Sequence, residues 1–333
     1  MVLLLSSEEF ETSTDEVYSW LEHLNVSCFR LNGEDFINSA FSITLESTNQ
    51  DIKTILPDKA ISVIWNRRWT SFSFLNALDG YELNAKNIEQ IKQHLKSEFS
   101  TLREYFFRSL PENSWIDDYK HVRVNKLLVL EKANQFGLKI PATIVTNSKE
   151  KLRVFIREHK EIITKTIAEV HSFNDDGKLY VMGTTQLKEK DWDEKVPDLF
   201  FPSLFQQLIS KAIDIRVFYL DGKFYAMAIF SQRRKEAQID FRAYDFENPD
   251  RMVPFKLPDL VETQLLNLIN DLQMTHCSID MVKDKSGYFY FIEINPVGQF
   301  GMVSKPCNYY LEREVALYLL KRSKEKSYEI FKK

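Results

Sequence analysis

The side chains best suited to chemistry lie near the end of the chain, in a segment that is otherwise apolar. Residues 289–295 read Phe-Tyr-Phe-Ile-Glu-Ile-Asn, so Glu293 and Asn295 lie two residues apart. On a strand this spacing places both side chains on one face. A carboxylate in such surroundings lowers stability unless a partner balances it. The pattern therefore favours a functional role over an ordinary exposed hairpin residue.

A second acidic residue, Asp280, lies in the preceding apolar segment, and the two segments are typical of a β-hairpin. If Lys283 faces Tyr288 across the loop, Asp280 faces Phe291 and Glu293 is its diagonal neighbour on the same face, about 7 to 8 Å away. A loop one residue longer or shorter would put the two carboxylates on opposite faces. In the favoured register the carboxylates and the amide converge, and such oxygen ligands suit Mg²⁺ that also binds substrate phosphates.

Basic residues upstream of this hairpin narrow the choice of reaction. Lys165 and Arg216 lie in segments that resemble half-buried strands, and Arg242 follows an Asp-Phe pair. Arginine binds phosphate or carboxylate through two parallel hydrogen bonds, whereas lysine supplies a compact point charge. Each residue alone is more typical of a surface or a salt bridge. Their order along the chain relative to the acidic hairpin favours a phosphate site.

Several classes of protein are disfavoured by composition and by missing motifs. No Walker loop is present and no Gly-x-Gly-x-x-Gly follows a strand, which argues against P-loop and dinucleotide-binding folds. The formal net charge of -4 lacks the basic excess of a nucleic-acid-binding protein. No apolar run is long enough for a bilayer, so no membrane partner is expected. The cysteines, Cys28, Cys277 and Cys307, predict reduced thiols in the cytoplasm.

Hydrophobic periodicity predicts three parts with mixed α and β structure. The first part, residues 1–120, is an α/β domain with strands at 2–5, 26–31 and 60–65, a helix capped by Ser13 or Thr14, and a long helix at 85–110. The second part, residues 121–200, has helices at 125–136, closed by Gly137, and 149–157, and strands at 142–146, 162–170 and 178–182. The third part, residues 201–333, has hairpins at 214–230 and 277–295 and helices at 261–272 and from 311 onward.

The order of these motifs resembles the ATP-grasp superfamily over residues 113–310, and the Glu-x-Asn with its upstream Asp is the most specific part. The matching segments are 125–126, 137–141, Lys165, 205–209, 214–216, 240–242, 278–280 and 293–296. This resemblance implies an ATP-grasp fold, of class α/β (α+β), with an N-terminal α/β pre-ATP-grasp domain. The implied cofactors are ATP and Mg²⁺.

A narrower resemblance extends to nearly the whole chain. Segments 13–15, 30–35, 64–69 and 295–300 are similar to the graspetide synthetases, the microviridin-type maturases, and most similar to the maturase of grasp-with-spasm systems. The family implies an ADP-forming ligase that joins Asp or Glu side chains of a ribosomal precursor peptide to Ser or Thr hydroxyls or Lys amines. Macrocyclic esters or amides result. A homodimer is also implied.

The resemblance implies roles only for residues that match the motifs. For the nucleotide these are Lys126 and Lys165 at the phosphates, Gln206, Gln207, Leu208 and Ile209 at the adenine, and Asp214 at the ribose. For the reaction they are Arg242 at the γ-phosphate or acyl phosphate, Arg216 at the acceptor carboxylate, and Asp280, Glu293 and Asn295 at Mg²⁺. The hairpin that matches the phosphate lid, residues 171–183, departs from the glycine-rich pattern of many members because it holds only Gly177 and Gly183.

Other interpretations stay open from the residues alone. The same ATP site would serve a ligase that adds glutamate or another amino acid to a peptide or protein. A nucleotide-binding regulatory protein without turnover would also carry such a fold. In the first part of the chain, Arg67 and Arg68 between Trp65 and Trp69 either meet acidic residues of a peptide or form a structural ion pair.

Overall fold

Two compact units divide the chain in the computed structural model. The structure describes residues 1–8, 11–43, 45–46, 49–50, 55–69, 72–81, 84–119, 124–168, 172–175, 178–187, 192, 196–233 and 250–331. The first unit comprises residues 1–122, 299–304 and 310–333, and the second comprises residues 123–298 and 305–309. The C-terminal residues 310–333 thus belong with the start of the chain. The expected boundaries at residues 120 and 200 stay a prediction.

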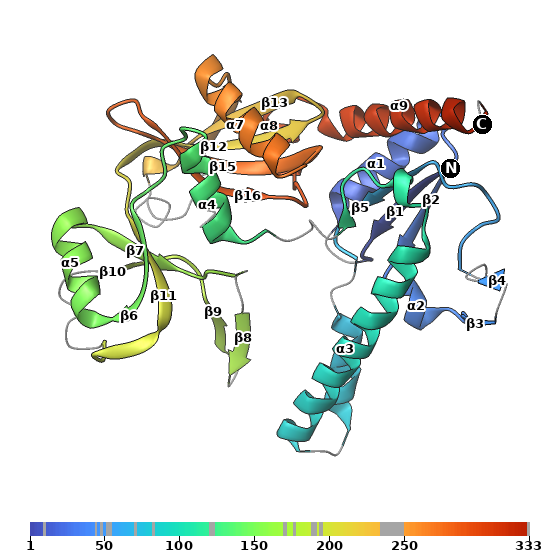
Figure 1. Cartoon of the computed structure of the whole chain (residues 1–333), viewed down its shortest axis with the longest axis horizontal. Coiled ribbons are helices and arrows are strands. Elements are labelled where there is room, and N and C mark those ends of the chain that lie inside the picture. The colour runs from blue at the N-terminus through green and yellow to red at the C-terminus, as the bar shows by residue number, and fades with distance from the viewer. Residues whose placement is uncertain are drawn as a thin grey trace. The chain divides into compact units, whose positions relative to one another are not determined.

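The apolar start of the chain forms the central strand of a parallel sheet in the first unit (Figure 1). The strand order is β2 (Cys28–Asn32), β1 (Val2–Ser6) and β5 (Val63–Asn66). All five residues of β1 are buried, as expected for a parallel strand that is covered on both faces. Helix α1 (Thr12–His23) packs against α9 (Leu311–Phe331), which also contacts β1 and β5.

An aromatic core fills the other side of this sheet. Phe99, Phe106 and Phe107 of helix α3 (Ala85–Ser109) pack with Trp69 and with residues of β1. Trp69 stacks on Phe106 with ring centroids 5.6 Å apart. Smaller elements complete the unit: α2 (Asp35–Asn38), β3 (Leu45–Glu46), β4 (Asn49–Gln50), η1 (Ser73–Gly80) and η2 (Glu112–Ser114).

The predicted cap of the first helix is wrong. Helix α1 begins at Thr12, and the residue before it, Glu11, makes no capping hydrogen bond through its side chain. Thr14 lies inside the helix, and its hydroxyl donates to Glu11 Oε2 at 3.1 Å. The hydroxyl that looked like a cap in the sequence therefore binds a buried carboxylate instead. By contrast, the long helix α3 starts where expected, after Asn84, whose side chain accepts from the Asn87 N–H.

Among its described residues, the second unit has two larger antiparallel sheets and one two-stranded antiparallel pair (Figure 1). The first has the order β10 (Thr185–Leu187), β7 (Ile162–Lys165), β11 (Leu199–Gln207) and β6 (Thr143–Ser148). Helix α5 (Lys149–His159) packs its residues Leu152, Phe155 and Ile156 on Phe205 of this sheet. The predicted strand 162–170 is shorter than expected. It ends at Lys165, and the partner of β9 (Lys178–Val181) is β8 (Ser172–Asp175).

The second sheet of this unit carries the acidic hairpin. Its strand order is β14 (Arg251–Phe255), β13 (Lys223–Phe230), β12 (Lys211–Leu220), β15 (His276–Asp284) and β16 (Phe289–Asn295). Helices α4 (Lys126–Gln135) and α7 (Asp259–Asp271) cover one face and share its apolar core. The predicted turn between β12 and β13 is confirmed, since Asp221 and Gly222 have φ of 44° and 88°, the positive values that a two-residue I′ hairpin requires.

The remaining elements are η4 (Ser231–Arg233) and α8 (Gly301–Cys307). The cysteines Cys28, Cys277 and Cys307 are free thiols. In the part of the chain that the structure describes, no helix has the length and apolar character that a bilayer crossing needs.

Candidate functional site

Asp280 and Glu293 lie directly opposite each other on β15 and β16, so the predicted register is wrong. Lys283 pairs with Phe289 and not with Tyr288, and the loop is therefore longer than expected. In a regular ladder this shift would turn Glu293 to the other face. The register shifts between Asp280 and Met281, which leaves one extra residue on β16, and Glu293 returns to the side of Asp280.

The side chain of Asp284 explains the longer loop. Its Oδ1 accepts from the N–H of Ser286 at 2.9 Å and from the N–H of Tyr288 at 2.8 Å. Gly287 follows with φ of 95°, which glycine adopts readily. The turn is thus closed by a local carboxylate, and the bulge farther along β16 compensates for it.

Arg216 extends this row of charges onto the neighbouring strand. It lies opposite Asp280 in the β12–β15 ladder, and its Nη1 donates to Asp280 Oδ1. Both residues are 8% exposed. Charged groups buried to this degree need a partner of opposite sign, so the pair holds both side chains in place on this face of the sheet.

Lys126 approaches the other carboxylate from helix α4. Its Nζ lies 3.7 Å from Glu293 Oε2, and each side chain is about a quarter exposed, at 25% and 24%. Asn125 caps the helix by accepting from the N–H groups of Leu127 and Leu128, which fixes Lys126 as its first residue. Two of the predicted cations and both carboxylates therefore meet in one row, in the order Lys126, Glu293, Asp280 and Arg216.

Asn295 lies on the same face, two residues beyond Glu293 and opposite Ser278. Its Oδ1 accepts from the Val297 N–H at 3.0 Å, and an amide oxygen has a second lone pair. Among the described residues no group of three or more His, Cys, Asp or Glu is placed to hold a metal ion. Two carboxylates and an amide oxygen fit Mg²⁺ that keeps waters and phosphate oxygens as further ligands.

Lys165 and Gln206 share a face of the other sheet. Lys165 pairs with Leu204, and Gln206 pairs with Ile163. This face is the opposite one from Phe205, which packs under α5. Gln206 is 1% exposed, and its Nε2 donates to Thr143 Oγ1 at 2.9 Å. The register thus brings a lysine and a buried amide to the face away from the helix.

The next residues along the chain differ in orientation. Gln207 lies two residues after Phe205 on β11, so its side chain lies on the same face, the one covered by the helix. Only its backbone borders the other face. Its N–H donates to Ala142 O at 2.9 Å. Leu208 and Ile209 follow the end of β11 and connect it to β12. These residues therefore form the crossing from one sheet of the unit to the other.

Asp214 is placed differently from the expectation of a ribose contact. It is 4% exposed; its Oδ1 accepts from Lys211 Nζ at 2.7 Å, and its Oδ2 accepts from Ser231 Oγ. Both carboxylate oxygens are thus bound within the sheet. Arg242, predicted at the γ-phosphate, lies outside the described residues, as does the centre of the expected lid hairpin, residues 176–177.

Solved structures with a similar fold are ATP-grasp ligases and macrocyclases. A ligase from Chryseobacterium gregarium, RiPP-associated and of ATP-grasp type, in complex with ADP and a leader and core peptide, is 24% identical with a TM-score of 0.79, covering 96% of each chain. The macrocyclase MdnC of Microcystis aeruginosa MRC, bound with precursor peptide MdnA, is 25% identical with a TM-score of 0.79, covering 96% of this chain and 99% of MdnC.

A further neighbour is the ATP-grasp ligase PsnB, complexed with minimal precursor, Mg and ADP. It is 17% identical with a TM-score of 0.73, and 97% of each chain is covered. The chain has the fold of the RiPP-associated ATP-grasp ligases. No protein-family model matches the sequence, and no curated protein sequence matches it. The resemblance read from the sequence is thus confirmed at the level of the ATP-grasp fold, while the roles of single residues stay predictions.

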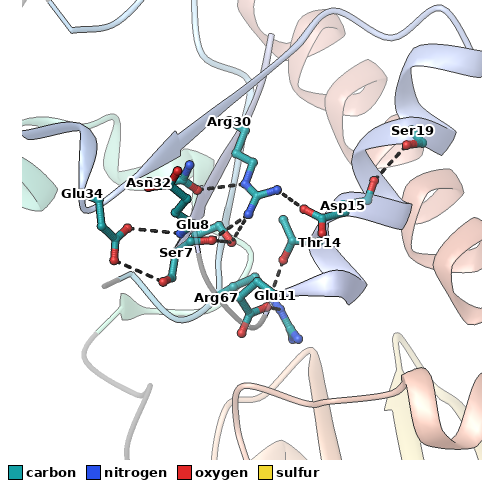
Figure 2. Close-up of polar contacts among 11 residues, drawn as sticks. Ser7, Glu8, Glu11, Thr14, Asp15, Ser19, Arg30, Asn32, Glu34 and Arg67 are labelled. Atoms are coloured by element: carbon teal, nitrogen blue, oxygen red, sulfur yellow. Dashed lines mark hydrogen bonds and ion pairs between the residues drawn. The ribbon is translucent and has the colours of Figure 1, made fainter. Parts of the chain in front are cut away.

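The first unit of this ATP-grasp chain holds a polar cluster at the carboxyl ends of its strands (Figure 2). Glu34 accepts from Ser7 Oγ and from the Glu8 N–H, both at 3.2 Å. Arg30 donates to Ser7 O at 2.7 Å and pairs with Asp15. These contacts fasten the segment after β1. The sequence alone did not predict these contacts, because only the adjacency of parallel strand ends brings these residues together.

Arg67 and Arg68 follow β5 at the same edge, and the structure separates their roles. Arg67 is 1% exposed, and its Nε lies 3.6 Å from Oε2 of the buried Glu11. Burial lowers the pKa of Arg67 to about 10; Glu11 opposes this shift and Arg68 adds to it. Arg67 therefore forms a structural ion pair with Glu11, one of the two alternatives that the sequence left open for this arginine. The side chain of Arg68 is 49% exposed.

Proposed function

We propose that this chain is an ATP-dependent carboxylate ligase that acts on a ribosomally made precursor peptide. It converts Asp or Glu side chains to acyl phosphates and joins them to Ser or Thr hydroxyls or to Lys amines, giving macrocyclic esters or amides. The row formed by Lys126, Glu293, Asp280 and Arg216, on one face of an ATP-grasp sheet, carries this proposal. Its two central carboxylates, with a cation at each end, suit a metal ion, phosphate oxygens and a substrate carboxylate side by side.

The chemistry needs positioning and neutralisation of oxygen charge more than a protein nucleophile. A carboxylate oxygen is a poor leaving group, and phosphoryl transfer from ATP makes it a good one. Mg²⁺ held by Asp280, Glu293 and Asn295 would neutralise charge on the transferring phosphoryl group. Arg216, paired with Asp280, presents a guanidinium to the acceptor carboxylate. Excluding water protects the acyl phosphate until the peptide hydroxyl or amine attacks.

The remaining candidate residues bind the nucleotide. Lys126 and Lys165 bind its phosphates, and Arg242 neutralises the γ-phosphate. The adenine lies against the crossing between the sheets, where Gln206 offers a buried amide, and the backbone of Leu208 and Ile209 offers hydrogen-bonding groups. Asp214, held by Lys211 and Ser231, supports β12 and reaches the ribose only if one of these contacts opens.

The proposed ligase activity also implies a partner. The partner is a precursor peptide with a leader and a core that bears acidic and hydroxyl groups, and the enzyme works in the cytoplasm as a homodimer without nucleic acid or membrane. The likeness to MdnC, which was solved with its precursor peptide, supports a peptide substrate over the addition of a free amino acid. The presence of Asp280, Glu293 and Asn295 supports turnover over a regulatory role.

The intact mass of the peptide encoded beside this gene tests the proposal, after incubation with the enzyme, ATP and Mg²⁺. Loss of one water per bond formed, dependent on ATP, is the expected result. A gain of one amino-acid residue mass would instead identify an amino-acid ligase. An unchanged mass with ATP consumption absent would overturn the proposed activity on this peptide.

A further inference from the structure

The two neighbouring arginines after β5 occupy different environments. The Arg67 guanidinium lies 5.0 Å from the centroid of the Trp65 ring and 5.6 Å from that of Phe300. These contacts fill the space around it and join the segment containing Phe300 to the end of β5. Arg68 is the neighbour that keeps a half-exposed side chain. Burial of one arginine thus fixes the backbone from which the other projects.

One carboxylate serves both guanidinium groups. Glu11 places Oε2 at 3.6 Å from Arg67 Nε and Oε1 at 3.8 Å from Arg68 Nε. Thr14 also donates to this carboxylate at 3.1 Å, which holds it in position (Figure 2). Glu11 thus lies between two guanidinium groups. Burial is the largest cause of the lowered pKa of Arg67, and the like charge of Arg68 lowers it further.

Gln299 sets the direction of the Arg68 side chain. With the Gln299 amide oriented so that its oxygen faces the guanidinium, it accepts from Nη1 at 3.2 Å and from Nη2 at 2.9 Å. A guanidinium has five N–H donors, and Gln299 takes the parallel pair between Nη1 and Nη2. One further N–H remains on each terminal nitrogen, and these two point to opposite sides of the planar group. The half-exposed guanidinium can therefore donate a charge-assisted hydrogen bond from one of them to an incoming carboxylate.

Arg68 lies at one edge of the parallel sheet of the first unit, just after β5 ends at Asn66. The edge itself is where ligands bind in open parallel sheets, beyond the carboxyl ends of the strands.

We propose that Arg68 binds an acidic side chain of the precursor peptide, with Gln299 and Glu11 orienting its guanidinium and buried Arg67 fixing its backbone. The inference rests on the proposed function and adds a substrate-recognition residue to it. The bound carboxylate adds a negative charge beside Arg68 and accepts a charge-assisted hydrogen bond from it. Recognition here is separate from the carboxylate that reacts at Arg216.

Binding of two peptides to the full-length protein tests this assignment. The first is a synthetic, fluorescently labelled copy of the peptide encoded beside this gene, and the second replaces each Asp and Glu by Asn and Gln. The wild type should bind the acidic peptide more tightly than the neutral one. Arg68→Gln should reduce this preference by about 10-fold, the effect of one lost charge-assisted hydrogen bond, while the contribution of Arg216 stays. Arg68→Lys should restore part of it, because lysine keeps the charge but lacks the planar guanidinium.

Arg108→Gln is the matched control, since Arg108 is a surface arginine of the same unit, 64% exposed and paired with Glu104 within α3. It should keep the full preference. Equal preference for the acidic peptide in wild type and Arg68→Gln, with both folded and binding ATP equally, would overturn the assignment. Absence of mass change in the wild-type reaction would overturn the proposed function instead, because the binding assay does not depend on turnover.

Discussion

Asp280 and Glu293 face each other across β15 and β16 because one extra residue bulges from β16 between Phe291 and Glu293. Two carboxylates directly opposite on neighbouring strands repel each other. The structure offsets this repulsion with one cation for each, Arg216 for Asp280 and Lys126 for Glu293. The four charged side chains are thus coupled, and adding or removing one charge changes the electrostatic energy of the other three.

Glu293→Gln should abolish product formation while the protein stays folded. The amide keeps the shape of the side chain but removes the charge that a metal ion requires, and we expect a loss of about 100-fold or more. Product mass and the melting temperature are the two measurements. Glu131→Gln on the exposed side of α4 is the control, and full activity in Glu293→Gln would rule out the metal assignment.

Lys126→Met should weaken ATP binding more than peptide binding. The substitution keeps the stem of the side chain but removes the cation that lies 3.7 Å from Glu293. We expect an increase of about 10-fold in the Kd for ATP, the effect of one lost charge-assisted contact. Titration calorimetry with ATP and with peptide measures both. A change confined to peptide binding would move Lys126 out of the nucleotide site.

Asp214→Asn distinguishes support of the sheet from contact with the ribose. Loss of the buried pair with Lys211 should lower the unfolding free energy by about 3 to 5 kcal/mol, measured by urea denaturation. The preference of the enzyme for ATP over 2′-deoxy-ATP should stay as in the wild type. If that preference disappears in the variant while stability is unchanged, Asp214 contacts the ribose after all.

Glu11→Gln should destabilise the first unit, because Arg67 would then be buried without its carboxylate. The pKa of Arg67 is lowered to about 10, below its unfolded value, so the buried charge costs stability at every pH below that point and the cost is relieved only as the pH rises above it. Replacing both partners, in Glu11→Gln with Arg67→Met, should recover much of the loss.

A double-mutant cycle on urea midpoints near neutral pH measures this coupling. The single variants Glu11→Gln and Arg67→Met supply its other corners. Strictly additive losses would show that the two residues contribute independently, and would contradict the ion pair at 3.6 Å.

Local patterns in the sequence determined much of the fold and most of the candidate residues. Helical periodicity located α3, Asp221-Gly222 located the turn between β12 and β13, and the apolar run around Glu293 marked the acidic strand. Each of these depends on neighbours within a few residues, because capping, turn geometry and the alternation of side chains are short-range properties of the backbone.

Tertiary structure alone decided the pairing of these residues. The sequence predicted a regular ladder beside Asp280, and only the packed sheet reveals the bulge that brings Glu293 opposite it. The sequence also provided no reason to distinguish Arg67 from its neighbour Arg68. Only the folded chain shows that Arg67 is buried, because the rings of Trp65 and Phe300 that contact it come from segments more than 200 positions apart. Register and burial arise from long-range packing, so no short stretch of the chain contains them.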